Sequence, residues 1–91
     1  MMDTGKRTRR DRLISLVVDI LGPARTPQPV PVHDRLADIG MSSINMVNLM
    51  LAVEAEFDIT IPQTEITPEN FRSIASIEVL VGRLTQSAGA G

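Results

Sequence analysis

Apolar residues recur at helical spacing in three segments of the chain, which predicts three helices of ordinary length. The first segment covers residues 13–21 and ends at the strong terminator Gly22-Pro23. The second runs from Ser42-Ser43 to about Phe57, and the third follows Ser76, which is placed to cap it. The apolar positions of the first and third segments are Leu13, Leu16, Val17, Ile20 and Leu21, then Ile77, Leu80, Val81 and Leu84.

The middle segment is apolar around most of its circumference. Its members form two adjoining stripes, Met46, Met50, Val53 and Phe57 beside Ile44, Val47, Leu51 and Ala55. The remaining line is polar or small and consists of Asn45, Asn48, Ala52 and Glu56. A helix of this kind is normally enclosed by other elements on most sides. We therefore expect it to be the central helix of the fold.

The connecting segments complete the predicted architecture. Residues 23–40 contain four prolines and no helical pattern, which predicts a long loop with Leu36 and Ile39 as anchors in the core. The stretch FDITIP, residues 57–62, is predicted to be an extended link whose Phe57, Ile59 and Ile61 point inward. Thr67-Pro68-Glu69 has the pattern of a helix start and predicts a short helix that ends near Arg72. The expected fold class is all-α: a four-helix bundle with three longer helices, one short third helix and a long first loop.

Composition limits the possible chemistry. The 91 residues suit one domain, which we place at residues 10–85 between a flexible basic arm (1–9) and a flexible tail (86–91). With no cysteine and one histidine, His33, the chain offers no thiolate nucleophile, no disulfide and no metal cluster. It shows neither a signal peptide nor an apolar run of membrane-spanning length. We therefore expect a soluble, cytoplasmic monomer.

Charge is distributed unevenly along the chain. Residues 6–12, KRTRRDR, hold five basic residues and one acid, whereas from residue 13 onward four basic residues stand against nine acidic ones. The acidic body and the absence of aromatic residues among the basic ones argue against nucleic-acid binding. A solvated arm that leads into the first helix is the expected role of this segment.

Two adjacent serines at the start of the central helix are the main candidate site. Ser42 is placed to cap the helix, which stabilises it by about 1 kcal/mol. Ser43 would then occupy the first helical position, where its hydroxyl is not needed for capping. The positive end of the helix dipole and its free N–H groups would favour a phosphate ester there. The alternative is that both serines are ordinary cap and turn residues.

The wider pattern resembles the phosphopantetheine-dependent carrier proteins, a family of acyl and peptidyl carriers. LADIGMSSINMVNLMLAVEAEFDITIP matches the Gly-x-Asp-Ser-Leu motif that opens the second of the family's four helices, and also that helix's ending, EFDITIP. ITPENFRSIASIEVLVGRL resembles the family's short third helix and its fourth. By this resemblance Gly40 is the motif glycine, Ser43 carries 4′-phosphopantetheine, and Ile44 replaces the motif leucine. Ser42 replaces the motif aspartate, which keeps a cap but removes a charge that helps to engage the transferase and its metal ion.

The resemblance also implies partners and a function. In fatty-acid carriers the second helix is acidic near its start, whereas this chain has Asn45 and Asn48 there. We therefore expect partners that bind by hydrogen bonds and apolar contact, at a surface formed by Met41, Ser42, Ile44, Asn45 and Asn48. The Gly-x-Ser-Ser variant resembles small free-standing carriers that accept an activated amino acid from a ligase similar to a seryl-tRNA synthetase.

The expected function is that of a free-standing acyl or aminoacyl carrier in a specialised pathway, with cargo held as a thioester. Its expected partners are a phosphopantetheinyl transferase, an acyl- or aminoacyl-activating ligase, and a downstream acyltransferase or synthase. No base stands near either serine in the sequence, so we do not expect an enzyme and assign no catalytic residue. The alternative from another class is an unmodified small helical domain that binds protein or DNA.

Overall fold

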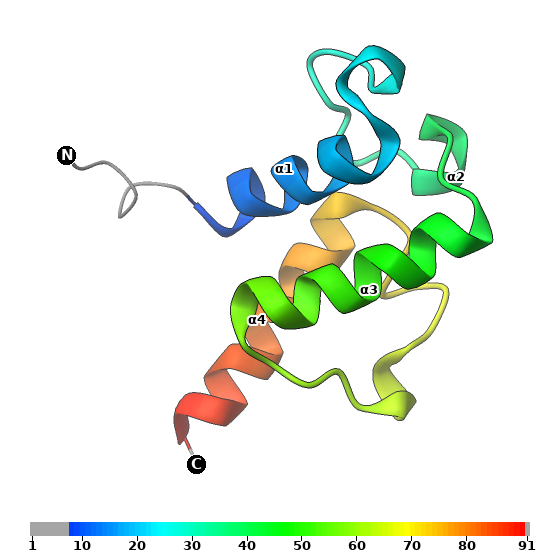
Figure 1. The fold of residues 1–91 in the computed structure, drawn as a ribbon. Helices are drawn as coiled ribbons and strands as arrows, with labels where there is room; N and C mark the ends of the chain where they lie inside the picture. The colour runs from blue at the N-terminus through cyan, green and yellow to red at the C-terminus, as the bar shows by residue number, and fades with distance from the viewer. Residues whose placement is uncertain (1–7, 91) are drawn as a thin grey trace, which may run out of the picture.

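The computed structural model describes the backbone of residues 8–90 and the side chains of residues 8–85. It contains four α-helices, α1 (Arg9–Leu21), α2 (Leu36–Ile39), α3 (Ser43–Phe57) and α4 (Ile74–Ala90). Two short 3-10 helices, η2 (Pro23–Arg25) and η3 (Gln63–Glu65), lie in the connecting segments (Figure 1). No strand occurs among residues 8–90, so the all-α prediction is confirmed. None of the helices found there is both long enough and apolar enough to cross a membrane.

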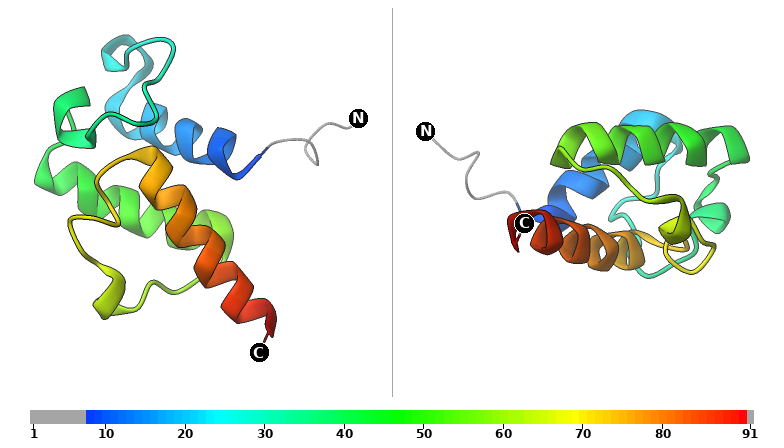
Figure 2. Two further views of the ribbon diagram at one scale, coloured as in Figure 1. Left: turned by 180° about the vertical axis from the view of Figure 1, so that it is seen from behind. Right: turned by 90° about the horizontal axis from the view of Figure 1, so that it is seen from below.

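The three longer helices enclose one apolar core. α1 packs against both α3 and α4, and the view from below shows α3 and α4 on opposite sides of the core (Figure 2). The buried apolar residues come from every helix and from both long connections: Leu13, Val17, Leu36, Met41, Leu49, Val53, Ile61, Phe71, Ile74, Ile77, Leu80 and Val81. This set confirms the apolar faces predicted for the first and last helices, and Leu36 as an anchor.

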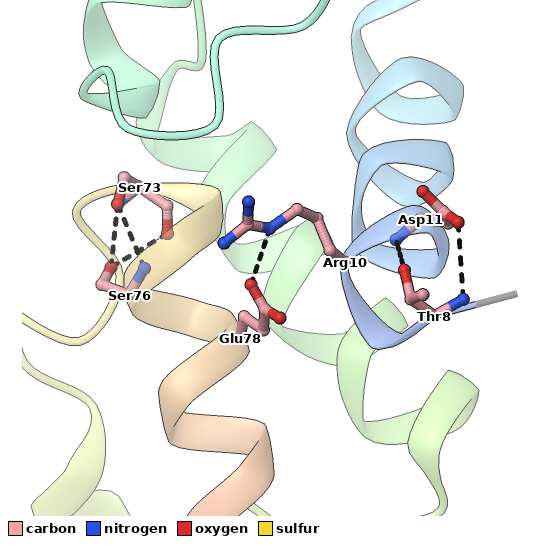
Figure 3. Close-up of polar contacts among 6 residues, drawn as sticks. All are labelled: Thr8, Arg10, Asp11, Ser73, Ser76 and Glu78. Atoms are coloured by element: carbon pink, nitrogen blue, oxygen red, sulfur yellow. Dashed lines mark hydrogen bonds and ion pairs between the residues drawn. The ribbon is translucent and has the colours of Figure 1, made fainter.

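α1 begins at Arg9 because Thr8 and Asp11 form a capping box. The Thr8 hydroxyl accepts a hydrogen bond from the Asp11 N–H at 3.0 Å, and the Asp11 carboxylate accepts one from the Thr8 N–H (Figure 3). Arg9 is therefore helical and does not belong to an arm, whereas residues 1–7 of the predicted arm lie outside the described residues. α4 continues to Ala90, into the segment predicted to be a tail.

Two arginines of the basic segment hold α1 to the other helices. Arg10 of α1 pairs with Glu78 of α4 at 2.8 Å (Figure 3). Arg12 pairs with Glu56 near the end of α3, also at 2.8 Å. The described part of the basic segment thus takes part in helix packing and is more than a solvated arm.

A short helix does occur, but it is α2, inside the predicted long loop. The N–H of Leu36 donates to the carbonyl of Arg72 at 2.8 Å, so a bond from a distant segment fixes the start of α2. Residues 67–72, predicted to form the short third helix, make a single turn in which the Phe71 N–H donates to the Thr67 carbonyl at 3.2 Å. The Thr67 hydroxyl caps this turn by accepting from the Asn70 N–H, as the Thr-Pro-Glu pattern suggested.

The turn at 67–72 stops where α4 begins, and the cap of α4 differs from the prediction. The Ser73 hydroxyl accepts from the Ser76 N–H at 3.1 Å, and the Ser76 hydroxyl accepts from the Ser73 N–H at 2.9 Å (Figure 3). Ser73 is therefore the N-cap, and Ser76 lies three positions into the helix. Both serines suit a cap on sequence grounds, and the position of the preceding turn selects Ser73.

Candidate functional site

The start of α3 is built around Ser42, as the sequence predicts. Ser42 has extended backbone angles and is the N-cap of the helix that begins at Ser43. Its hydroxyl accepts a hydrogen bond from the Asn45 N–H at 3.1 Å and donates one to Oδ1 of Asn45 at 2.9 Å. The same Oδ1 accepts from the Ser42 N–H at 3.0 Å. The two residues thus form a reciprocal capping box.

Ser43 differs from Ser42 in having a free side chain. It is the first residue of α3 and is exposed, and its hydroxyl has no hydrogen-bond partner among the side chains described, those of residues 8–85, or the backbone of residues 8–90. Among the N–H groups at this end of α3, those of Ser42 and Asn45 are used by the capping box. The N–H groups of Ser43 and Ile44 have no such partner in the described part of the chain. A phosphate ester on Ser43 would find these two donors and the positive end of the helix dipole beside it.

The chain reaches this site through Gly40 and Met41. Gly40 has φ 120° and ψ 10°, which a residue with a side chain rarely adopts. Its conformation lets the Met41 N–H donate back to the Leu36 carbonyl at 3.0 Å, which closes α2. The turn therefore aims Met41 inward and leaves the two serines outside.

Met41 is buried, with 6% of its surface exposed, and belongs to the core. Its prediction as an exposed partner-binding residue is therefore wrong. Met41 precedes the N-cap, and residues at that position commonly pack against the fourth residue of the helix, here Met46. Met46 is half-buried and packs on the core. The capping pattern in the sequence was the signal that could have identified Met41 as buried.

α3 carries an exposed apolar face that the sequence analysis did not predict. Of its residues only Leu49 and Val53 are buried, so the helix is not enclosed on most sides. Ile44, Val47 and Leu51 are 73%, 52% and 58% exposed. They follow one another at spacings of three and four, so they lie on one face of the helix, which we call the apolar stripe. Exposed apolar residues gathered on one face indicate a binding surface.

The remaining predicted partner residues fall into two groups. Ile44 and Asn48 are exposed, and Asn48 follows Val47 of the apolar stripe directly in the sequence. Ser42 and Asn45 are engaged with each other in the capping box. Asn45 has a low helix propensity, and its place near the start of α3 is therefore explained by a contact within the chain.

Both acidic side chains of α3 are bound inside the molecule. The Glu54 carboxylate accepts the Ile61 N–H at 2.8 Å. The Glu56 carboxylate accepts from Nε of Arg12 at 2.8 Å. The exposed face of α3 therefore offers apolar and neutral polar groups, with its two carboxylates already paired.

Comparisons with known proteins agree with this geometry. Residues 11–82 match a family model described as "Phosphopantetheine attachment site". Aminoacyl carrier protein 1 of Bradyrhizobium diazoefficiens is 51% identical over 81 residues, which make up 89% of this chain and 90% of that protein. Aminoacyl carrier protein 2 of the same organism is 49% identical over 72 residues, or 79% of this chain and 81% of that protein.

Similar solved structures come from complexes of a ligase with its carrier protein. One is the crystal structure of Bradyrhizobium japonicum glycine:[carrier protein] ligase with glycylated carrier protein (TM-score 0.72, 44% identity, 79% of this chain and 96% of the matched chain). Another holds the cognate carrier protein and an analogue of glycyl adenylate (TM-score 0.66, 48% identity, 88% and 99% of the two chains).

These matches set aside the alternative of an unmodified interaction or DNA-binding domain. The family model spans most of the chain, and the relatives are about half identical to it over nearly their whole length. The chain therefore belongs to the phosphopantetheine-dependent carrier proteins, which hold their cargo on a covalently attached 4′-phosphopantetheine and catalyse no reaction themselves.

Proposed function

We propose that this chain carries an aminoacyl group, as a thioester, on a phosphopantetheine attached to Ser43. The observation that carries the proposal is the contrast between the two serines at the start of α3. Ser42 gives its hydroxyl to the capping box, whereas Ser43 is exposed and its hydroxyl has no partner among the described residues. Of these two serines, Ser43 alone combines a hydroxyl with no partner among the described residues and neighbouring N–H groups that are likewise unbonded there.

The attachment step follows from the chemistry of coenzyme A. In the complex with a phosphopantetheinyl transferase, the Ser43 oxygen would bond to the phosphorus that bears pantetheine. The pyrophosphate P–O bond would break, adenosine 3′,5′-bisphosphate would leave, and the hydroxyl proton would pass to a base of the transferase. This chain contributes the nucleophilic oxygen and two N–H donors for the new phosphodiester, those of Ser43 and Ile44.

The cargo is proposed from the relatives and from the composition of the chain. The chain has no cysteine, so the thiol that holds the cargo comes from the prosthetic group. The relatives are named aminoacyl carrier proteins, and the similar structures are complexes of a glycine:[carrier protein] ligase. An aminoacyl-activating ligase is therefore the proposed loading partner, and an acyltransferase or synthase would receive the cargo in the cytoplasm.

We propose that the ligase docks on the apolar stripe and on Asn48. These side chains lie on the exposed face of the helix that begins at Ser43, so an enzyme that covers them would also cover the attachment point. Because Glu54 and Glu56 are paired within the chain, apolar contact would supply most of the binding free energy. Compared with the surface predicted from the sequence, this docking surface keeps Ile44 and Asn48. It contains Val47 and Leu51 in place of Met41, Ser42 and Asn45.

Intact mass spectrometry tests the attachment. Purified protein is incubated with coenzyme A and a broad-specificity phosphopantetheinyl transferase, and its mass should rise by one phosphopantetheine. Peptide mapping should place the added mass on Ser43. A chain that keeps its original mass with every transferase tried would refute the proposed function, and added mass on Ser42 would reverse the roles of the two serines.

A further inference from the structure

We propose that Asn45 is the residue that directs phosphopantetheine to Ser43 and away from Ser42. This inference rests on the proposed function, because it presumes that one of the two serines is modified. Two hydroxyls on consecutive residues present a transferase with a choice. The structure distinguishes them by a hydrogen bond that only Ser42 makes.

The Ser42 hydroxyl is held on both its donor and its acceptor side. Its proton points to Oδ1 of Asn45 at 2.9 Å, and its oxygen accepts the Asn45 N–H at 3.1 Å. A serine oxygen that attacks phosphorus must give up its proton to a base of the transferase. For Ser42 that proton is already bound to an amide oxygen, which is a poor base, and the bond must break before the reaction can start.

The side chain of Asn45 is well suited to this role. One oxygen, Oδ1, accepts from both the N–H and the hydroxyl of Ser42. The bond to the N–H fixes Oδ1 beside Ser42, and the bond to the hydroxyl then immobilises the competing nucleophile. Asn45 thus acts as a positioning residue through Ser42 and need not contact coenzyme A.

The test measures modification of Ser42 where Ser43 cannot compete. In the Ser43→Ala protein, Ser42 is the remaining hydroxyl of the pair, and its rate of modification by one transferase is followed by mass spectrometry of the peptide. Adding Asn45→Ala should raise this rate between about two- and tenfold, which corresponds to the loss of one hydrogen bond. Adding Asn45→Gln, whose amide oxygen can accept both bonds and is an equally poor base, should leave the rate low.

The matched control is Gln63→Ala in the same Ser43→Ala protein. Gln63 is an exposed amide side chain on η3, far along the chain from both serines and without a side-chain hydrogen bond to any described residue. It should leave the rate on Ser42 unchanged. Circular dichroism of each variant reports the folded fraction, to which the rates are normalised, so that partial unfolding does not count as selectivity.

The outcomes separate this inference from the proposed function. The inference is wrong if wild-type protein is modified on Ser43 but Asn45→Ala does not raise the Ser42 rate. It is also wrong if Ser42 is never modified. In either case the position of each serine at the start of the helix, and not Asn45, determines which one is modified. The inference also fails if Asn45→Gln raises the Ser42 rate as much as Asn45→Ala does. If wild-type protein is not modified at all, the proposed function itself fails.

Discussion

The guanidinium of Arg12 lies 4.4 Å from the centroid of the Phe57 ring, directly over its face. The same side chain donates from Nε to the Glu56 carboxylate at 2.8 Å and from Nη2 to the Glu56 carbonyl at 2.7 Å. Arg12 therefore binds the last turn of α3 in three ways at once. A cation at this end is also favoured by the helix dipole. The contact joins α1 to the end of the helix whose beginning carries the site.

Replacing Arg12 should therefore destabilise the fold. Arg12→Ala is expected to lower the free energy of unfolding by about 1–2 kcal/mol, since it removes a cation–π contact and hydrogen bonds that are partly exposed. Urea denaturation followed by circular dichroism measures the change. Arg25→Ala is the matched control, because Arg25 is exposed and makes no ion pair among the described residues. Equal midpoints for the two variants would contradict the role of Arg12.

The two serines should separate stability from modification. Ser42→Ala removes the N-cap and should cost about 1 kcal/mol of unfolding free energy, yet the protein should still accept phosphopantetheine. Ser43→Ala should change the stability by less than about 0.5 kcal/mol and should reduce the mass gain to the slow residual modification of Ser42. Urea denaturation measures the stability of both variants, and intact mass spectrometry measures their modification. Loss of modification in Ser42→Ala alone would reverse our assignment.

Met41 should behave as a core residue. Met41→Ala is expected to lower the free energy of unfolding by about 2–4 kcal/mol, because it leaves a cavity beside the α2 turn. Chemical denaturation measures the loss. Val79→Ala serves as the control, since Val79 is apolar but 63% exposed on α4, and it should have little effect. A Met41 variant as stable as wild type would show that the side chain is not held in the core.

The link to the cargo should be a thioester. Loaded protein treated with neutral hydroxylamine should lose its cargo as the hydroxamate and return to the mass of the phosphopantetheine form. Hydroxylamine cleaves thioesters readily, whereas the phosphodiester to serine should survive under the same conditions. Cargo that resists the treatment would point to an amide or ether linkage and would remove the thiol from the proposal.

The apolar stripe should decide how fast the ligase loads the carrier. Val47→Glu and Leu51→Glu each place a charge where we expect apolar contact, and each should lower kcat/KM for loading at least about tenfold. Val79→Glu makes the same change on α4 and should not affect loading. The wild-type rate should depend only weakly on ionic strength, because salt screens exposed charges and leaves apolar contacts intact.

A different result would relocate the docking surface. A steep fall in the wild-type rate with added salt, together with normal loading of both stripe variants, would mean that charge outside α3 guides the ligase. Arg9 would then be the first residue to replace, because it is exposed and makes no ion pair within residues 8–85.

The three longer helices could be predicted from the sequence because their apolar periodicity is strong. Ser42 as the cap of α3 and Ser43 as its first residue followed from local chemistry that needs no tertiary information. The apolar stripe could not be predicted, since Ile44 and Leu49 are equally apolar in the sequence. Only the positions of α1 and α4 decide which of the two is covered.

Tertiary hydrogen bonds account for the other differences. α2 forms where the Leu36 N–H meets the Arg72 carbonyl, a contact between segments far apart in the sequence. Because this contact fixes the position of Arg72, residues 67–72 form only one turn before α4 begins after its N-cap, Ser73. Met41 is buried because the conformation of Gly40 reverses the chain, which a glycine in the sequence permits but does not require.

If the apolar stripe is the docking surface, it would also determine how several enzymes can share one carrier. If the transferase, the ligase and the cargo acceptor all bind the helix that begins at Ser43, only one of them can bind at a time. The carrier must then bind them one after another. If apolar contact at the stripe, and not charge, guides the encounter, association would proceed at the ordinary rates of about 10⁵–10⁷ M⁻¹s⁻¹. The order in which the enzymes bind would then be set by how quickly each one dissociates once the chemical state of the phosphopantetheine group has changed.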